Sequence, residues 1–381
     1  MQADGDVGRS TEILRYRGGH RVALHHEGAV VFGEMEAAIA AAVDHVHLET
    51  YILRTDGVGT RLLDALAERA RAGVAVRVVY DALGSRGLDA TRVARYAAEG
   101  IEFAEFNPPS RWFWRFRPRR RDHRKLLLVD GRVAFLGGLN IGDEYASGGP
   151  DGRPWRDAHL GLEGPQVAEL EALFVESWFR SGGSSFDWRK LVATESEADG
   201  DASVAILADG PSYRRRRVRD FFVDELQHAR SRVLLVSPYF APGARVLDAL
   251  AAARDRGVEI DLVLAGHTDH PILRRAARAI CPRLVRHGVR VYEESHAMVH
   301  AKLAAFDDRI AVVGTSNLDR QSLQHSCEVN AVFAGSDVPK WIHEHFGPDG
   351  RALDPVRDPR EEARRWLDPW LDRWATFWAQ L

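Results

Sequence analysis

Cysteine, lysine and long apolar runs are all scarce in this chain of 381 residues. Two cysteines, Cys281 and Cys327, cannot form a disulfide framework or a zinc site with four cysteine ligands. No run of about 18 apolar residues occurs, so we expect no membrane-spanning helix. The first residues lack the basic and apolar regions of a signal peptide. These absences favour a protein of a reducing, cytoplasmic compartment.

The scarcity of lysine is the sharpest feature of the composition. The net charge of -3 argues against a surface that coats nucleic acid. Among the 52 basic residues only four are lysines: Lys125, Lys190, Lys302 and Lys340. A compact ammonium and a planar guanidinium are not equivalent at a tight site. Each lysine that is kept in so arginine-rich a chain is therefore a candidate for a specific role.

The sequence contains an internal repeat. Residues 123–141 align without a gap over residues 300–318. Eight positions are identical, which gives the pairs His123/His300, Lys125/Lys302, Leu126/Leu303, Asp130/Asp307, Arg132/Arg309, Ala134/Ala311, Gly137/Gly314 and Asn140/Asn317. Two of the four lysines thus occupy equivalent positions in the two copies.

The repeat extends upstream of these motifs and predicts an α/β fold. Residues 63–67 recur as 247–251, and residues 73–74 as 257–258. In each half we expect a strand (46–52; 232–239), a helix (58–72; 244–256), a strand (74–80; 258–264), a helix, a short strand (101–105; 288–292) and then a hairpin. Such alternation is typical of layered α/β proteins. Duplicated halves usually pack about a pseudo-two-fold axis, which would bring the two motifs face to face.

The chain is expected to divide into two lobes, a linker and a tail. The predicted parts are an amino-terminal lobe at 1–190, a polar linker at 191–203, a carboxy-terminal lobe at 204–340 and a tryptophan-rich helical tail at 341–381.

The repeated motif has the residue types that phosphodiester chemistry needs. In His-x-Lys-x-x-x-x-Asp the histidine and lysine project to one face of a strand. Two copies supply two imidazoles and two ammonium groups. The lysines can neutralise the phosphate oxygens while one imidazole attacks phosphorus and the other protonates the departing alkoxide. This set needs no metal, and we expect no cofactor; His25-His26 and His267 with His270 lack a matching Cys or Asp set. The alternative is a structural His–Lys pair in a duplicated scaffold.

The paired motifs, each followed by a glycine-rich turn and an asparagine, resemble those of the phospholipase D superfamily. The wider pattern is similar to bacterial cardiolipin synthases, of the branch without amino-terminal membrane spans. It is carried by Glu49–Tyr51, Tyr80–Ser85, Trp155–Asp157, Leu162–Pro165 and Gly314–Leu323. The resemblance implies a duplicated phospholipase D-type α/β fold, two pseudo-two-fold-related lobes with a mixed β-sheet flanked by helices in each, and one active site between them.

The resemblance also implies roles for individual residues. His123 would be the nucleophile that forms a phosphohistidine, and His300 the general acid and base, although the motifs alone are symmetric. Lys125, Lys302, Asn140 and Asn317 would hold phosphate oxygens. Asp157 and Glu328 stand where the family places the acids that orient the imidazoles; the repeat agrees for Glu328 but requires six extra residues before Asp157. The remaining motif residues, Asp130, Asp307, Gly137, Gly138 and Gly314, would shape the hairpins and turns.

Two aromatic segments bear on the substrate. Residues 111–121 interleave arginine with aromatic residues just before the first motif, and tryptophan recurs every four residues from Trp366 to Trp378. Both compositions suit a membrane interface with anionic headgroups. The first would equally suit packing or single-stranded bases, and the second packing on the protein core. The candidate membrane contacts are Trp112, Trp114, Arg119, Arg120, Trp370 and Trp374.

Taken with the resemblance, these features predict a metal-independent transphosphatidylation between two phospholipids. Phosphatidylglycerol would be the donor and glycerol the product, with phosphatidylglycerol, phosphatidylethanolamine or water as the acceptor. We expect peripheral association with the cytoplasmic membrane and no nucleic-acid partner. The alternatives are a phospholipid hydrolase, a nuclease of the same superfamily, and a membrane-binding scaffold without activity. The oligomeric state stays open.

Overall fold

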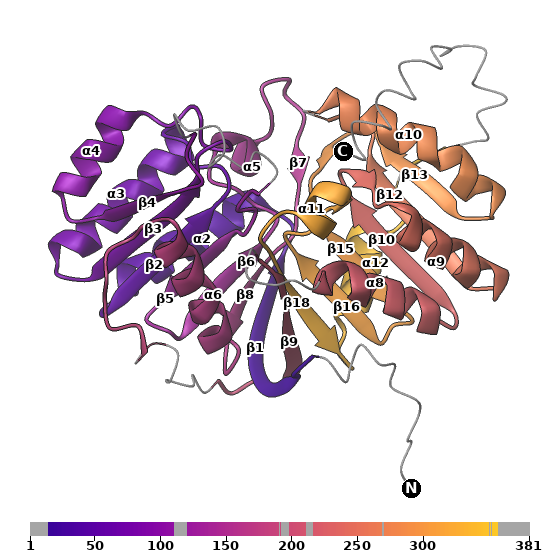
Figure 1. Cartoon of the computed structure of the whole chain (residues 1–381), viewed down its shortest axis with the longest axis horizontal. Coiled ribbons are helices and arrows are strands. Elements are labelled where there is room, and N and C mark those ends of the chain that lie inside the picture. Colours follow the sequence, from indigo (N-terminus) through magenta and orange to yellow (C-terminus); the bar gives the residue numbers. More distant parts are fainter. Residues whose placement is uncertain are drawn as a thin grey trace, which may run out of the picture.

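The fold is described from a computed structural model of the chain. It describes residues 14–109, 120–189, 191, 198–210, 216–268, 270–349, 351 and 353–356. Two α/β halves lie side by side, with strands β1 and β9 between them (Figure 1).

The amino-terminal half contains eight strands and five helices within the described residues. In chain order they are β1 (Arg17–His25), α2 (Gly28–Ala41), β2 (His45–Thr50), α3 (Gly57–Arg71), β3 (Ala75–Asp81), α4 (Ala90–Ala98), β4 (Glu102–Phe106), β5 (Leu126–Val129), β6 (Val133–Gly137), α5 (Asp143–Ser147), β7 (Trp155–Arg156), β8 (His159–Glu163) and α6 (Val167–Arg180).

The carboxy-terminal half repeats this order with additions. Its elements are β9 (Ala202–Asp209), α8 (Arg217–His228), β10 (Arg232–Ser237), β11 (Phe240–Ala241), α9 (Ala244–Asp255), β12 (Glu259–Ala265), α10 (Pro271–Arg286), β13 (Arg290–Glu294), β14 (Met298–Val299), β15 (Leu303–Phe306), β16 (Ile310–Gly314), β17 (Leu318–Asp319), α11 (Arg320–Gln324), β18 (Glu328–Ala334), α12 (Val338–Phe346) and β19 (Asp354–Pro355).

One continuous sheet joins the two halves. Its order is β19-β13-β12-β10-β15-β16-β18-β9-β1-β8-β6-β5-β2-β3-β4. Read outward from the central antiparallel pair β1 and β9, the two sides have the same strand order, apart from β19 at one edge. In each half three outer strands run parallel and the others antiparallel, so each half-sheet is mixed. The predicted duplicated α/β fold is confirmed.

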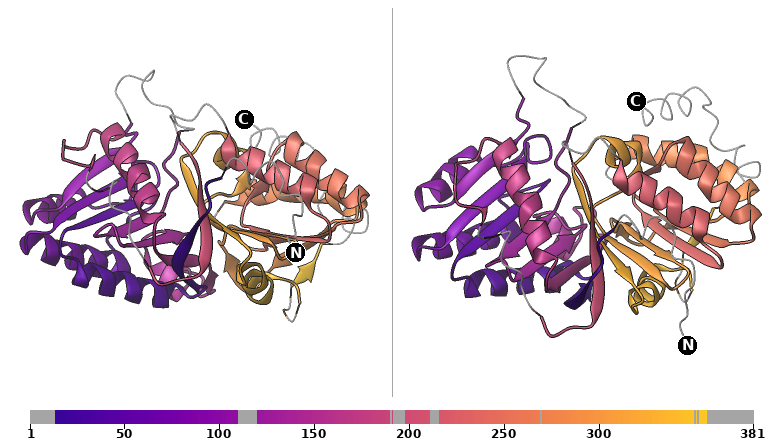
Figure 2. Two further views of the ribbon diagram at one scale, coloured as in Figure 1. Left: turned by 90° about the horizontal axis from the view of Figure 1, so that it is seen from below. Right: turned by 60° about the horizontal axis from the view of Figure 1, so that its bottom comes forward.

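Helices cover both faces of the sheet in each half (Figure 2). In the first half, alternation along β2 sends Val46 and Leu48 into the core beneath α2 and α3, while His47 turns to the opposite face, against α6. The second half has α8, α9 and α10 on one face and α12 on the other. A third core, shared by the two halves, lies between α6 and α12 and contains residues of both half-sheets. The halves are thus held together by apolar packing as well as by strand pairing.

Two secondary-structure elements cross the predicted boundaries. Strand β9 begins at Ala202, inside the predicted linker 191–203, because its residues pair with both β1 and β18. The predicted start of the tail at residue 341 falls inside α12, where Ile342 and Phe346 are fully buried in the shared core. The first residues after 340 therefore belong to the folded body.

None of the helices in the described ranges is both long enough and apolar enough to cross a lipid bilayer.

Candidate active site

Each His-x-Lys motif lies directly before the first strand of its hairpin. His123 and Lys125 precede β5, and His300 and Lys302 precede β15. The strands that follow are fully buried, with neighbours on both sides in the sheet. Lys125 and Lys302 are each 2% exposed, which is unusual for lysine. The hairpins thus fix two cations and two imidazoles within the protein interior.

The backbone before each motif pairs with the opposite half. The His123 N–H donates to Cys327 O (3.0 Å), and the Cys327 N–H donates to Arg121 O (2.8 Å). In the other half β14 runs parallel to β7, and the His300 N–H donates to Arg156 O (2.7 Å). An acid follows each of these backbone partners: Glu328 follows Cys327, and Asp157 follows Arg156. The backbone pairing therefore carries the acid of one half to the histidine of the other.

The two histidine–carboxylate pairs cross between the halves. His123 Nδ1 lies 3.1 Å from the carboxylate of Glu328, and His300 Nδ1 lies 2.6 Å from Asp157 Oδ2. Asp157 and Glu328 are 3% and 0% exposed. A carboxylate on Nδ1 fixes the tautomer and leaves Nε2 for the reacting atoms. The two pairs are related by the repeat, and the charge of His300 acts on the pKa of His123.

Each lysine side chain bends back to the backbone of its own motif. Lys125 Nζ donates to His123 O (2.8 Å), and Lys302 Nζ donates to His300 O and lies 2.9 Å from His300 Nδ1. Burial, together with the charge of Lys302, lowers the pKa of Lys125 to about 7. The negative charge of a phosphate bound between the lysines would offset both causes of the lowered pKa. The pair is therefore suited to bind an anion.

The electrostatics of the two histidine–acid pairs differ. Burial, with the positive charges of Lys125 and Lys302, holds the pKa of His123 well below its usual range. Burial raises the pKa of Glu328 to about 7, although Lys125 acts in the opposite direction. Burial alone would also raise the pKa of Asp157, but the charges of His300 and Lys302 outweigh it and lower that pKa. The surroundings thus favour the ionised form of Asp157 and the protonated form of Glu328.

The turn after each hairpin contributes to this difference. A Cβ atom at Gly138 would lie 1.8 Å from Asp157 Oδ1, so only glycine leaves room for that carboxylate. The equivalent residue of the second copy is Thr315, whose hydroxyl donates to Glu328 and accepts from the Val329 N–H (3.0 Å). The departure from the repeat at Thr315 thus lies in direct contact with the acid.

The two motif asparagines are both buried but have different surroundings. Asn140 Oδ1 accepts from the Ile52 N–H (3.2 Å), and Asn140 Nδ2 lies 2.6 Å from the hydroxyl of Tyr145. Asn317 Oδ1 is buried and has no hydrogen-bond partner among the described residues. Of these two asparagines, Asn317 is the one whose side-chain oxygen has no partner in the described part of the chain, and this oxygen can accept a hydrogen bond from a bound group.

The motif aspartates lie at the far ends of the hairpin strands. Asp130 accepts from the backbone N–H groups of Val43, Asp44 and His45, and Asp307 from those of residues 230–232. Each stands in a left-handed turn, with φ of 52° and 51°. Their carboxylates brace the loop before the neighbouring strand and do not contact the imidazoles.

Sequence reasoning missed the aromatic rings around the imidazoles. The Tyr51 ring lies edge-on to His123 (centroids 5.2 Å apart), and both Tyr145 and Trp155 lie 5.5 Å from the His300 ring. Tyr51 and Trp155 fall in segments that carry the family resemblance, but a single sequence gives no sign of which ring meets which histidine.

Sequence reasoning also missed Arg124, which is fully buried beside His123. Its guanidinium donates to Leu173 O and the Ser177 hydroxyl of α6 and to Asp209 O of β9, each at 3.1 Å. Arg124 thus links the first motif to elements of both halves. The repeat gave no signal for it, because the equivalent residue is Ala301.

Most of the predicted membrane contacts lie outside the described residues, namely Trp112, Trp114, Arg119, Trp370 and Trp374. Arg120 is described; its side chain is exposed, and its carbonyl accepts from Asn107 Nδ2 (2.8 Å).

Comparison with known proteins places the site in a family. The family model described as cardiolipin synthase, PLD-like domain, matches residues 35–148 and 222–349, so its two matches contain the two motifs. This chain belongs to that family. It is 34% identical to the cardiolipin synthase of Alkalihalophilus pseudofirmus over 84% of this chain and 64% of that protein. It is 32% identical to cardiolipin synthase 1 of Bacillus anthracis over 89% of this chain and 69% of that protein. The chain thus spans about two thirds of the length of these curated relatives.

Two solved structures have a fold similar to that of this chain. Phosphatidylserine synthase of Haemophilus influenzae superimposes with a TM-score of 0.74 at 12% identity, covering 98% of this chain and 97% of that chain. Polyphosphate kinase of Porphyromonas gingivalis superimposes with a TM-score of 0.60 at 16% identity, covering 94% of this chain and 53% of that chain. At such low identity these likenesses establish the fold alone.

Proposed function

We propose that this protein is a phosphatidyltransferase of the cardiolipin synthase type, which joins two phospholipids and releases glycerol. The observation that carries the proposal is the pair of crossed histidine–carboxylate contacts, flanked by two buried lysines. The names of the relatives, which are cardiolipin synthases, support the choice of phosphatidylglycerol as the donor.

In the first step His123 Nε2 attacks the phosphorus of phosphatidylglycerol. A P–N bond forms, the P–O bond to the headgroup glycerol breaks, and the proton on His300 Nε2 passes to the departing oxygen. The depressed pKa of His123 favours the neutral imidazole that a nucleophile requires. The ionised Asp157 stabilises the imidazolium form of His300 that a general acid requires.

In the second step a hydroxyl of another phosphatidylglycerol attacks the phosphohistidine. Its proton passes to His300 Nε2, the P–N bond breaks, and His123 is regenerated with cardiolipin as the product. Lys125 and Lys302 would hold the non-bridging oxygens in both steps, and Asn140 and Asn317 would donate to these oxygens through their Nδ2 groups. The net reaction exchanges one phosphodiester for another, so transfer depends on keeping water from the intermediate. The aromatic rings of Tyr51, Tyr145 and Trp155 beside the imidazoles support such exclusion.

Because both substrates are membrane lipids, we also propose that the protein binds peripherally to an anionic membrane surface. The arginine- and aromatic-rich segment 111–121, which leads directly into His123, is the candidate contact.

Lipid mass spectrometry tests the proposal. The purified protein is incubated with phosphatidylglycerol vesicles in EDTA, beside His123→Ala and a control, His287→Ala, which changes an exposed histidine. We expect cardiolipin and glycerol from the wild type and the control, and neither from His123→Ala. Phosphatidic acid alone would replace the proposal with a hydrolase. No product from phosphatidylglycerol or phosphatidylethanolamine would overturn the lipid assignment in favour of another phosphodiester.

A further inference from the structure

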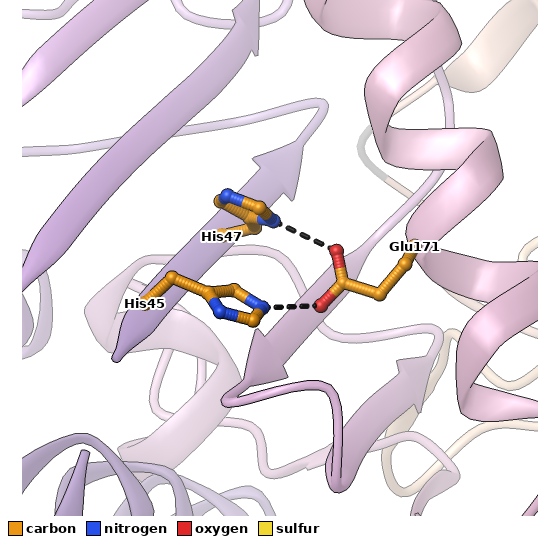
Figure 3. A group of neighbouring side chains, drawn as sticks. All are labelled: His45, His47 and Glu171. Atoms are coloured by element: carbon orange, nitrogen blue, oxygen red, sulfur yellow. Dashed lines mark hydrogen bonds and ion pairs between the residues drawn. The ribbon is translucent and has the colours of Figure 1, made fainter. Parts of the chain in front are cut away.

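A second cluster of titratable side chains lies at the opposite end of β2 from the active site. His45 and His47 are the first and third residues of this strand, and Glu171 faces them from α6 (Figure 3). Tyr51, which contacts the His123 ring, follows the other end of the strand. At about 3.3 Å per residue, Tyr51 lies about 20 Å along the strand from His45 and about 13 Å from His47, so the cluster takes no part in the proposed reaction.

The three side chains converge on one point. His45 Nε2 lies 2.9 Å from Glu171 Oε1, and His47 Nδ1 lies 2.8 Å from Glu171 Oε2. The donor atoms all lie within 4.8 Å of one another. The side chains of His45, His47 and Glu171 are 4%, 0% and 0% exposed. Each imidazole thus has its own carboxylate oxygen in a region that bulk water does not reach.

We propose that His45, His47 and Glu171 bind one divalent transition metal ion, with Zn²⁺ as the best match. Two imidazole nitrogens and a carboxylate are ligands that Zn²⁺ accepts at about 2.0–2.2 Å. Because Glu171 presents one oxygen to each histidine, chelation by both oxygens would complete four donors without a further residue. The donor atoms would have to close around the ion by rotation of the side chains, while the backbone of β2 and α6 keeps its place.

The surroundings of the ligands favour this role. His45 Nδ1 lies 2.8 Å from Asp44 Oδ2, and a carboxylate on the far nitrogen is the usual outer partner of a metal-binding histidine. The Asp130 carboxylate holds the backbone N–H groups of residues 43–45, which fixes the start of the strand. The Phe174 ring stacks on His47, with centroids 4.3 Å apart and planes 6° apart. The ligands are thus held by partners that a bound ion would not displace.

One neighbouring side chain, Arg77, disfavours binding of a metal ion at this site. Arg77 Nη1 lies 3.3 Å from His47 Nε2, where its positive charge and its N–H both compete with a metal-bound imidazole. Arg77 also pairs with the half-exposed Glu102 (3.3 Å) and lies over the Phe186 ring. It can therefore retain these partners when the contact with His47 is given up. Removing Arg77 should strengthen metal binding, which gives the proposal a test of opposite sign.

The ion would fasten α6 to β2, and both elements support the active site. Helix α6 provides Leu173 O and Ser177 to Arg124, the neighbour of His123. The Ser177 hydroxyl in turn donates to Glu49 Oε1 of β2 (2.6 Å). A metal at the far end would thus stabilise the scaffold behind the first motif.

Metal titration of the whole protein tests the site. Protein freed of metal by chelators is titrated with Zn²⁺ against a competing indicator, and with Co²⁺ for its absorption spectrum. We expect one equivalent to bind below micromolar concentration and to raise the melting temperature by several degrees. In His45→Asn the affinity should fall at least 100-fold, in His287→Asn it should not change, and in Arg77→Ala it should rise at least threefold.

X-ray absorption of the zinc-loaded wild type tests the site without any variant, which matters if His45→Asn does not fold. We expect the zinc spectrum to show two imidazoles, oxygen ligands and no sulfur. Absence of stoichiometric binding, binding that His45→Asn leaves intact in a folded protein, or a different set of scatterers would each overturn the site. None of these results bears on cardiolipin formation, so the metal site and the proposed function stand or fall separately.

Discussion

The two halves of the molecule share their hairpins but differ around their acids. Each hairpin begins with a histidine and a buried lysine, and its first strand ends at an aspartate that braces the loop before the neighbouring strand. Asp157, however, fills the space left by Gly138 and lies against a histidine that its charge can hold protonated. Glu328 instead receives the Thr315 hydroxyl and has a pKa near 7.

In the proposed mechanism this difference gives the two histidines of a duplicated scaffold different roles. The backbone framework must stay equal, because both motifs use it to reach the opposite half. The immediate neighbours of the acids are free to differ, and they set the proton affinity of each pair. One histidine can therefore act as the nucleophile and the other as the acid, although the motifs that carry them are alike.

The largest effect should separate the two histidines. His123→Ala should abolish turnover and the covalent intermediate, whereas His300→Ala should slow the first step by roughly 10²–10⁴-fold. A substrate with a p-nitrophenol leaving group needs no proton, so it should restore the first step in His300→Ala alone. Initial rates and the intact mass of acid-quenched protein measure both effects. Restoration in His123→Ala instead would mean that the roles are reversed.

A smaller effect should come from exchanging the residues beside the acids. Gly138→Ala places a methyl group where Asp157 Oδ1 lies, so the carboxylate must move away from His300 and the rate should fall by about 10²-fold. Thr315→Ala removes one hydroxyl from Glu328 and should cost about tenfold or less. Steady-state rates compare the two variants, with circular dichroism as the control for folding. Equal losses would show that the two acid sites are not distinct.

The smallest effect is a pH dependence of stability. Burial raises the pKa of Glu328 from 4.5 to about 7 in the folded protein, so folding takes up a proton between these values. The contribution of Glu328 to stability is therefore present below pH 4.5 and is lost as the pH rises to 7. Relative to Glu328→Gln, the wild type should lose about 2 kcal/mol between pH 5 and pH 8. Urea unfolding at the two pH values measures this difference.

Asp157→Asn provides the matched control for that measurement. The pKa of Asp157 is lowered by folding, so its contribution is complete above the ordinary range of an aspartate and is lost only in stronger acid. The difference between the wild type and Asp157→Asn should thus be the same at pH 5 and pH 8. A slope like that of Glu328 would contradict the assignment of an ionised Asp157.

Much of the site could be predicted because its chemistry is local in the sequence. The spacing of His123 and Lys125 places both on one face, and the repeat predicts the same for His300 and Lys302. Arg124 and the ring of Tyr145 could not be predicted, since their contacts are made to elements distant in the chain. The pair His45 and His47 has the same spacing as the motifs' His and Lys, but only the packing of α6 on β2 brings Glu171 beside it.

The sequence by itself determined the duplication, the α/β order of each half and the candidate residues for the proposed chemistry, because repeat identity and strand periodicity are properties of neighbouring residues. Only the tertiary structure decided that Glu328 serves His123 and Asp157 serves His300. The crossed contacts arise where the backbone of one half pairs with the backbone of the other. No sequence pattern marks such a pairing. The protonation of each pair is also tertiary, since it depends on burial and on charges brought from both halves.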